Sequence, residues 1–255
     1  MSGEILNVYD TAIVDDSLSS EEYHTYLPRI QSFNASDGIN HQDIYTYPHN
    51  SYIFIQGKTE EMLVVGGTGD VQLVNNAFLF LFDEIRYEIN DVEIDRNIKQ
   101  LITSTIKGYI SYSDNESKAL QSAGWIPKPQ NKQSTFITPH FTACIPLNFI
   151  LGFAEDYKKI IINARQELVL LRARNDDNCH KNSLKDGTIK MKMYLTNVDW
   201  RIRHITVNDE HRLQLLNALN KDMPILIPFR KWELFELPSL RPTKIYCNVS
   251  KFIIV

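Results

Sequence analysis

Cysteine is scarce in this chain, and the spacing of its few copies excludes several kinds of site. The 255 residues include only Cys144, Cys179 and Cys247, an odd number with no CxxC pair. This pattern argues against a zinc ribbon and against a disulfide framework. Reduced thiols are the ordinary state of cysteines inside cells, so the sequence favours an intracellular location.

Long apolar runs are also missing. No run reaches the roughly 20 apolar residues that a membrane-spanning helix requires. The first 16 residues contain neither a basic region nor an apolar core, so they do not form a secretory signal peptide. We therefore expect no membrane partner, and we interpret the glycosylation sequons at Asn34, Asn115 and Asn248 as accidental.

The residue patterns of common catalytic and metal sites are absent too. None of the seven histidines stands in an HxH or HExxH motif, and the chain has no GxSxG motif. The glycine-rich stretch 66–69 is followed by Asp70 instead of a lysine, which favours a turn over a phosphate-binding loop.

Paired carboxylates occur only as immediate neighbours in the sequence. Examples are Glu60–Glu61, Asp83–Glu84 and Glu155–Asp156. Neighbouring side chains diverge on a strand or a helix, so such pairs do not converge on a substrate. The sequence therefore predicts that the protein is not an enzyme and has no catalytic residues, no cofactor-binding residues, no metal ligands and no cofactor.

Charge is spread unevenly along the chain although the formal net charge is only −4. Residues 1–100 contain 17 acidic and 5 basic side chains, whereas residues 101–255 contain 14 acidic and 22 basic ones. Two interpretations fit this distribution. Either acidic and basic side chains interleave on one folded surface, or an acidic face of one copy meets a basic face of another copy in a self-assembling protein. Residues 158–205 hold 11 basic side chains with Tyr194 and Trp200 among them, which indicates either the solvated face of long strands or a nucleic-acid surface.

The most informative segment that is present runs from Val74 to Arg96. Asn90 and Asp91 tolerate left-handed backbone, so they predict a two-residue turn between two strands. The predicted cross-strand pairs are Ile89 with Val92, Glu88 with Glu93, Tyr87 with Ile94, and Arg86 with Asp95. We expect a buried face of Tyr87, Ile89, Val92 and Ile94, and an opposite, more exposed face of Arg86, Glu88, Glu93 and Asp95 with a cation near the two glutamates.

Helical spacing of apolar residues recurs later in the chain. The predicted helices are residues 97–111 with Ile98, Ile102, Ile106 and Tyr109 on one face, residues 146–157 with Phe149, Ile150, Phe153 and Tyr157 on one face, and residues 209–221, buried through Leu213, Leu216, Leu219 and Asn220. Ser113 and Glu116 form a capping box for a further short helix that ends at Gly124.

Extended segments account for most of the remaining chain. We predict strands at residues 51–58, 165–174, 190–205, 225–237 and 244–255. Residues 1–47 are acidic and then aromatic, which indicates an extended arm that folds against the body of the domain or a neighbouring copy. Many strands with a few short helices, and no alternating β-α-β units, predict an all-β sandwich.

Three ordered segments resemble a known family. They are VNNAFLFLFDEIRYEINDVEIDR at residues 74–96, ITSTIKGYISYSDNESKALQSAGW at residues 102–125 and IPLNFILGFAEDYKKIIINARQELVLLRARND at residues 145–176. They resemble the double jelly-roll-like proteins of invertebrate genomes, which are similar to the major capsid proteins of Polinton/Maverick-type and adintovirus-like elements. The resemblance extends over about residues 42–240 and includes FRKWELFELP.

The resemblance implies two jelly rolls in tandem and a trimeric, pseudo-hexagonal capsomer. For this chain it implies an extended N-terminal arm at 1–47, a first jelly roll with helical insertions at 48–240, and the start of a second, truncated jelly roll at 241–255. The family carries no catalytic residues, so none are transferred. We also expect that this half alone exposes apolar surface and associates with other chains.

Two functions remain open at this stage. The resemblance implies a structural, virus-derived capsid protein that self-assembles, forms a homotrimer when full-length and makes weak contact with packaged nucleic acid. Such a protein would lie inside the host cell, and in the virion if it belongs to an active element. The alternative is a host-retained jelly-roll module that binds a protein or a glycan without catalysis.

Overall fold

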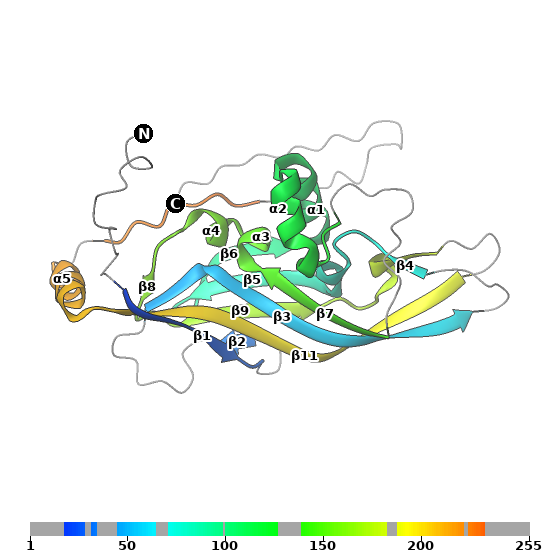
Figure 1. The fold of residues 1–255 in the computed structure, drawn as a ribbon, viewed down its shortest axis with the longest axis horizontal. Coiled ribbons are helices and arrows are strands. Elements are labelled where there is room, and N and C mark those ends of the chain that lie inside the picture. Colours follow the sequence, from blue (N-terminus) through cyan, green and yellow to red (C-terminus); the bar gives the residue numbers. More distant parts are fainter. Residues whose placement is uncertain are drawn as a thin grey trace, which may run out of the picture.

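The structure, a computed structural model, describes residues 18–28, 32–34, 45–64, 71–98, 100–126, 139–182, 188–221 and 224–232. Antiparallel strands form two larger sheets and one small sheet, and short helices lie between them along the chain (Figure 1). None of the described helices is long and apolar enough to cross a membrane.

The strand order brings distant segments of the chain together in each sheet. The first sheet has the order β1 (Leu18–Tyr26), β11 (Thr188–Val207), β3 (Tyr45–Val64) and β7 (His140–Pro146), and the short β8 (Ile161–Ile162) also pairs with β3. The second sheet has the order β2 (Ser32–Asn34), β9 (Gln166–Arg172), β5 (Phe82–Ile89) and β6 (Val92–Ile98). The small sheet pairs β4 (Val71–Leu73) with β10 (His180–Asn182).

The hydrophobic core lies between the two larger sheets. Ile53 and Ile55 of β3 are fully buried, whereas the alternate residues Tyr52 and Phe54 are only half-buried. Tyr87 of the second sheet meets Trp200 of the first edge-on, with ring centroids 6.2 Å apart. Alternation with one buried face is typical of sheets in a sandwich, so the predicted all-β sandwich is confirmed.

The strands β3 and β11 are each 20 residues long and extend beyond the rest of their sheet. Strand β7 pairs with β3 only from Tyr52 to Lys58, and β1 pairs with β11 only from Trp200 onward. In the described part of the chain, residues 59–64 and 188–193 therefore pair only with each other, as a two-stranded ribbon (Figure 1).

A buried chain of hydrogen bonds joins the two sheets. The Tyr87 hydroxyl donates to Gln166 Oε1 at 2.7 Å, and Gln166 Nε2 donates to Thr46 Oγ1 at 2.6 Å. All three side chains are buried. Because an unpaired polar group is costly in the interior, this chain favours one relative placement of β5, β9 and β3.

The hairpin of β5 and β6 confirms the predicted turn and its first two pairs. Asn90 and Asp91 have φ angles of 49° and 63°, and Ile89 pairs with Val92 as Glu88 does with Glu93. The expected cation is present, because Arg86 Nε lies 2.6 Å from Glu88 Oε1. Val92, at the tip beside the turn, is exposed, so its predicted burial is wrong.

Beyond these pairs the predicted register is wrong by one residue. A bulge leaves Ile94 without an opposite residue, so that Tyr87 pairs with Asp95 and Arg86 pairs with Arg96. A bulge of this kind turns the following side chains to the other face of the sheet. Asp95 is therefore buried at 2% exposure, where an exposed position was predicted.

The observed helices agree with the predicted ones more closely in their positions along the chain than in the faces that they bury. They are α1 (Gln100–Ser111), α2 (Asp114–Ala119), α3 (Leu147–Ile150), α4 (Gly152–Asp156) and α5 (Asp209–Leu219), with single 3-10 turns at Ala77–Leu81, Leu120–Ala123 and Asp177–Cys179. The capping box of Ser113 and Glu116 is confirmed, and Gly124 ends the following turn with a φ of 85°. Phe149, Ile150, Phe153 and Tyr157 are all buried, but the single helix predicted at 146–157 is two short helices, α3 and α4, separated by the extended Leu151.

The buried face of α1 differs from its apolar stripe, and the burial predicted for α5 is wrong. Ile98 belongs to β6, and Ile102 and Tyr109 of α1 are exposed, because this helix instead turns Ser104 and Lys107 toward polar partners. No residue of α5 is buried, and Leu213 is 62% exposed. Helical spacing locates an apolar stripe, but the tertiary contacts decide what covers it.

The two ends of the described chain contact the sandwich in different ways. Residues 18–26 of the predicted arm form β1 along β11, and the Tyr26 hydroxyl lies 2.9 Å from His204 Nε2. Residues 224–232 are not a strand, so the strand predicted at 225–237 is wrong there, because Pro228 has no N–H and the Arg230 N–H bonds a side chain. The strand predicted at 244–255 and the turn at 66–70 lie outside the described residues, and the domain boundaries at 47 and 240 stay predictions.

Replacing Tyr87 by phenylalanine tests the bond between the sheets. Tyr87→Phe leaves Gln166 Oε1 without its buried donor, so we expect the free energy of unfolding to fall by about 1–3 kcal/mol. Urea denaturation measures the change. Tyr194→Phe, at a half-buried tyrosine of β11, is the matched control and should change stability by less than about 0.5 kcal/mol. Equal losses in the two variants would contradict the prediction.

Candidate functional site

The cysteines and histidines do not gather into a metal site in the part of the chain that the structure describes. No three His, Cys, Asp or Glu side chains there are grouped as metal ligands. Cys144 and Cys179 are free thiols, and burial raises the pKa of Cys179 to about 12, so this thiol stays protonated. Cys247, His41 and the glycine-rich stretch lie outside the described residues. The predicted absence of catalytic, cofactor and metal residues stays a prediction.

Several histidines have structural partners instead. His49 Nδ1 lies 2.7 Å from the carbonyl oxygen of Ala154, which ties β3 to α4. The rings of His24 and His204 pack with centroids 4.0 Å apart, on the neighbouring strands β1 and β11. Burial, together with the nearby His24, lowers the pKa of His204 to about 4, so this ring is neutral at pH 7.

A cluster of charged contacts lies where residues 224–232 pass α4 (Figure 1). Arg230 donates to Asp156 from Nε at 2.8 Å, from its terminal nitrogen at 2.6 Å and from its backbone N–H at 2.8 Å. The Arg230 guanidinium holds the pKa of Asp156 below its usual value. These three hydrogen bonds to the Asp156 carboxylate fix the position of Arg230 against α4.

The neighbouring Glu155 binds a different cation. Its Oε2 lies 2.7 Å from the ammonium of Lys107, a residue of α1 that is only 3% exposed. Trp232 donates to the same oxygen at 3.4 Å, and the Lys107 ammonium lies 5.7 Å from the Trp232 ring centroid. Glu155 and Asp156 thus point to separate partners, as expected for neighbouring carboxylates, and together they hold residues 230–232 against α1 and α4.

The first turn of α4 is held by Asp95. Its carboxylate accepts a hydrogen bond from the Phe153 N–H at 3.0 Å, and burial raises its pKa to about 6 against the lowering effect of backbone donors and Lys231. Gly152 lies against the 224–232 segment, because a Cβ at this position would come within 1.8 Å of the Arg230 carbonyl oxygen. Phe229 packs edge-on against Phe153, with centroids 5.5 Å apart.

Cations lie over aromatic rings on the strands β3 and β11. The Arg201 guanidinium lies 4.5 Å from the Phe54 ring centroid, and Lys58 and Lys192 lie 5.5 and 5.0 Å from that of Tyr194. Trp200, which the sequence placed among the basic residues of a nucleic-acid surface, is fully buried and inaccessible to a base. Contact with nucleic acid therefore stays a prediction. Of the two aromatic residues expected on that surface, only Tyr194 remains a candidate.

Ion pairs join the acidic first part of the chain to the basic second part. Glu21 pairs with Arg203, and Asp91 lies 2.8 Å from an Arg165 nitrogen. Such pairs support the interpretation that both signs interleave on one folded surface. The interpretation that opposite faces meet between copies is not tested by them.

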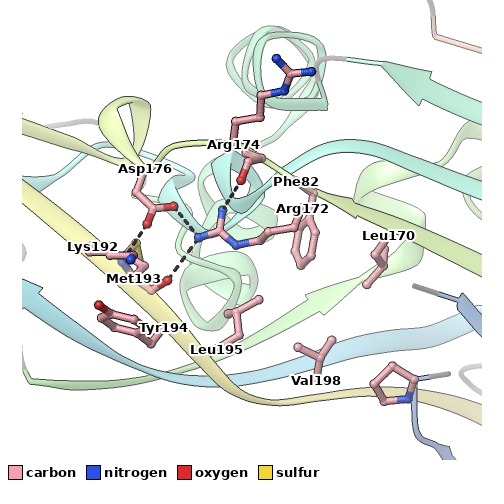
Figure 2. A pocket seen from close by; sticks show the side chains of 12 residues that line it. Phe82, Leu170, Arg172, Arg174, Asp176, Lys192, Met193, Tyr194, Leu195 and Val198 are labelled. Atoms are coloured by element: carbon pink, nitrogen blue, oxygen red, sulfur yellow. Dashed lines mark hydrogen bonds and ion pairs between the residues drawn. The ribbon is translucent and has the colours of Figure 1, made fainter. Parts of the chain in front are cut away.

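A pocket of about 520 Å³ lies between the two sheets (Figure 2). Its apolar wall includes Phe82, Leu170, Met193, Leu195 and Val198. At its polar end Arg172 forms an ion pair with Asp176 and donates to the carbonyl oxygens of Leu81, Ala173 and Met193. The pattern of the sequence did not indicate this pocket, because its walls come from residues between 28 and 198.

Replacing Asp95 by asparagine tests the buried carboxyl group through pH. The folded-state pKa of about 6 lies above the value near 3.9 of an unfolded chain, so the folded state binds more protons between these values. Wild-type stability should therefore lose roughly 2 kcal/mol through this group as the pH rises from 4 to 7. Asp95→Asn should remove that loss, as measured by urea denaturation across this pH range.

The matched control for this experiment is Asp83→Asn, since Asp83 is exposed on the neighbouring strand β5. This variant should keep the pH dependence of the wild type. An Asp95→Asn variant with the wild-type slope between pH 4 and 7 would contradict the assigned burial.

Trypsin cleavage tests the attachment of the 224–232 segment. Gly152→Ala should push the Arg230 carbonyl away, and Arg230→Ala should remove both side-chain bonds to Asp156. Each variant should be cleaved several-fold faster after Lys231, which corresponds to about 1 kcal/mol of lost protection. Arg174→Ala, at an exposed arginine elsewhere, should leave that rate unchanged. Wild-type cleavage rates in both test variants would show that these contacts do not hold the segment.

The comparisons with known proteins agree with this architecture. The chain is similar to the capsid protein in "PBCV-1 virus capsid, quasi-atomic model", with a TM-score of 0.53, 10% identity, and coverage of 89% of this chain and 50% of that chain. It is also similar to PBCV-1 VP54 fitted into a reconstruction of the virophage Sputnik, with a TM-score of 0.50 and the same identity and coverage. At this identity the likeness shows the fold, and the chain spans about half the length of these capsid chains.

A search of curated proteins gives no match. The narrower resemblance to Polinton-type elements stays a prediction. A family model described as a double jelly roll-like domain matches residues 71–252, which is more than half of the chain. The match includes the hairpin of β5 and β6, the helices α1 to α5 and the strands β9 and β11. The protein therefore belongs to the family of double jelly roll-like domain proteins.

Proposed function

We propose that this protein is a structural, capsid-like protein of viral origin that associates with copies of itself and catalyses no reaction. One observation carries the proposal: 89% of the chain shares the fold of the PBCV-1 capsid protein, in a chain that belongs to the double jelly roll-like family. In a full-length form with both jelly rolls, three copies build a pseudo-hexagonal capsomer, in the host cell and in the virion of an active element. Such a protein acts through the shape and complementarity of its surfaces.

Exposed apolar side chains support self-association. Ile110 of α1 is 77% exposed and Leu226 is 79% exposed. Their neighbours Tyr109 and Ile225 are also more than half exposed. Adjacent apolar residues on a surface are typical of contacts between proteins, whereas single ones are ordinary.

The second candidate function is a host-retained jelly-roll module that binds another molecule without catalysis. The pocket between the two sheets favours it, because structural packing alone does not require an open cavity with a polar end. The two functions differ in what they predict for the isolated chain. A capsid-like chain associates with itself, whereas a binding module stays a monomer.

Mass photometry over a range of concentrations tests the proposal on the purified 255-residue chain. We expect dimers or larger oligomers whose fraction grows with concentration. Ile110→Glu and Leu226→Glu should each lower the association constant about tenfold or more, because each places a charge in apolar contact surface. Lys118→Glu, an exposed residue of α2, changes the charge by more but removes no apolar surface, and it should have little effect.

A monomer that stays a monomer at every concentration would overturn the proposal and favour the binding module. Oligomers that respond equally to all three substitutions would also count against it, because the contact would then depend on net charge alone. Circular dichroism of each variant confirms that the sheets are formed.

A further inference from the structure

The pocket between the sheets opens where both sheets lack an outer strand. In the described part of the chain, β2 pairs only with residues 167–169 of β9, so residues 170–172 have no partner on that side. β1 pairs with β11 only from Trp200 onward, so residues 192–198 have no described strand partner on the β1 side. The pocket is lined by these two stretches, and Pro28, which follows β1, also contributes to its wall.

The wall of the pocket is mostly apolar and belongs to the core of the sandwich. Phe82, Leu170 and Met193 are buried members of that core, and Leu195 and Val198 are partly buried against it. Figure 2 shows Leu170, Leu195 and Val198 on the side away from the ion pair of Arg172 and Asp176. A volume of about 520 Å³ lies within the usual range for small-molecule sites, roughly 300–1,000 Å³.

The polar end carries an excess of positive charge. Asp176, which is 7% exposed, is neutralised by Arg172 and also accepts a hydrogen bond from the Met193 N–H at 2.8 Å. Lys192 stands beside this pair over the ring of Tyr194, and Arg174 lies at the rim with its guanidinium directed away from Arg172 (Figure 2). Lys192 is exposed, and its direct cross-strand neighbour on β3 is Glu60.

We propose that this pocket binds an amphiphile with one apolar chain and a single anionic end, such as a medium-chain carboxylate. The apolar chain lies along Leu170, Leu195 and Val198, where it replaces water against core residues. The carboxylate lies at Lys192, within reach of the fixed positive charge of Arg172 and of the Tyr194 hydroxyl. This binding site goes beyond the structural role proposed above, and it does not depend on self-association.

Isothermal titration calorimetry with three ligands of equal chain length tests the proposal. Dodecanoate, dodecanol and dodecyltrimethylammonium are each titrated into the full 255-residue chain below their micelle concentrations. We expect dodecanoate to bind with one molecule per chain and at least about tenfold more tightly than either of the others, since a charge contact of about 1.4 kcal/mol gives that factor. Native mass spectrometry then confirms the ratio of one ligand to one chain.

Matched pairs of variants locate the site. Lys192→Glu should weaken dodecanoate binding about tenfold or more and leave dodecanol unchanged, whereas Lys58→Glu should change neither. Lys58 is a suitable control because it lies over the same Tyr194 ring without lining the pocket. Val198→Trp should fill the pocket and abolish binding of both ligands, while Leu171→Trp, at an exposed residue of β9 outside the pocket, should not.

Three results would overturn the proposal. The first is the absence of saturable binding for dodecanoate, and the second is dodecanol or dodecyltrimethylammonium binding as tightly as dodecanoate. The third is an equal effect of Lys192→Glu and Lys58→Glu, which would place the carboxylate outside the pocket. Because Lys192 is exposed, its replacement leaves the fold intact and keeps the test valid even if Val198→Trp fails to fold.

Discussion

A single unpaired residue in β6 determines how the helices and the end of the described chain are placed. Because Ile94 is bulged out, Asp95 turns inward and reaches the N-terminal turn of α4. That helix then presents Glu155 to the buried Lys107 of α1 and Asp156 to Arg230. Without the bulge the carboxyl group would lie on the outer face, and α4 would lose the partner for its Phe153 N–H. The contacts of residues 229–232 therefore depend on one local irregularity in a strand more than 130 residues earlier.

The sequence predicted the features that are decided locally. The Asn90–Asp91 turn and the capping box of Ser113 and Glu116 each depend on residues within four positions of one another. The bulge at Ile94 could not be predicted in this way, because the partner of Asp95 lies 58 residues later in the chain. An apolar residue at position 94 fits a regular alternating strand equally well.

The buried faces of the helices and the candidate sites depend on contacts between residues that are still further apart in the sequence. Helical spacing placed Ile102 and Ile106 on one face of α1, yet the helix turns Lys107 to the interior, because Glu155 and the Asn148 carbonyl are there to receive it. The pocket between the sheets needs the ends of β1 and β2 to leave β11 and β9 uncovered at the same level. No pattern within one segment carries that information, since it arises from the pairing of four strands.

The paired ends of β3 and β11 have a mechanical consequence. A strand of 20 residues spans about 65 Å at roughly 3.3 Å per residue, so these two strands set the longest dimension of the sandwich. In the described chain their far ends pair as strands only with each other, and two-stranded ribbons twist more freely than wide sheets. The base of this ribbon is fixed, because the Met193 N–H and carbonyl oxygen bond Asp176 and Arg172, so twisting is confined to the residues toward Thr188 and Val64.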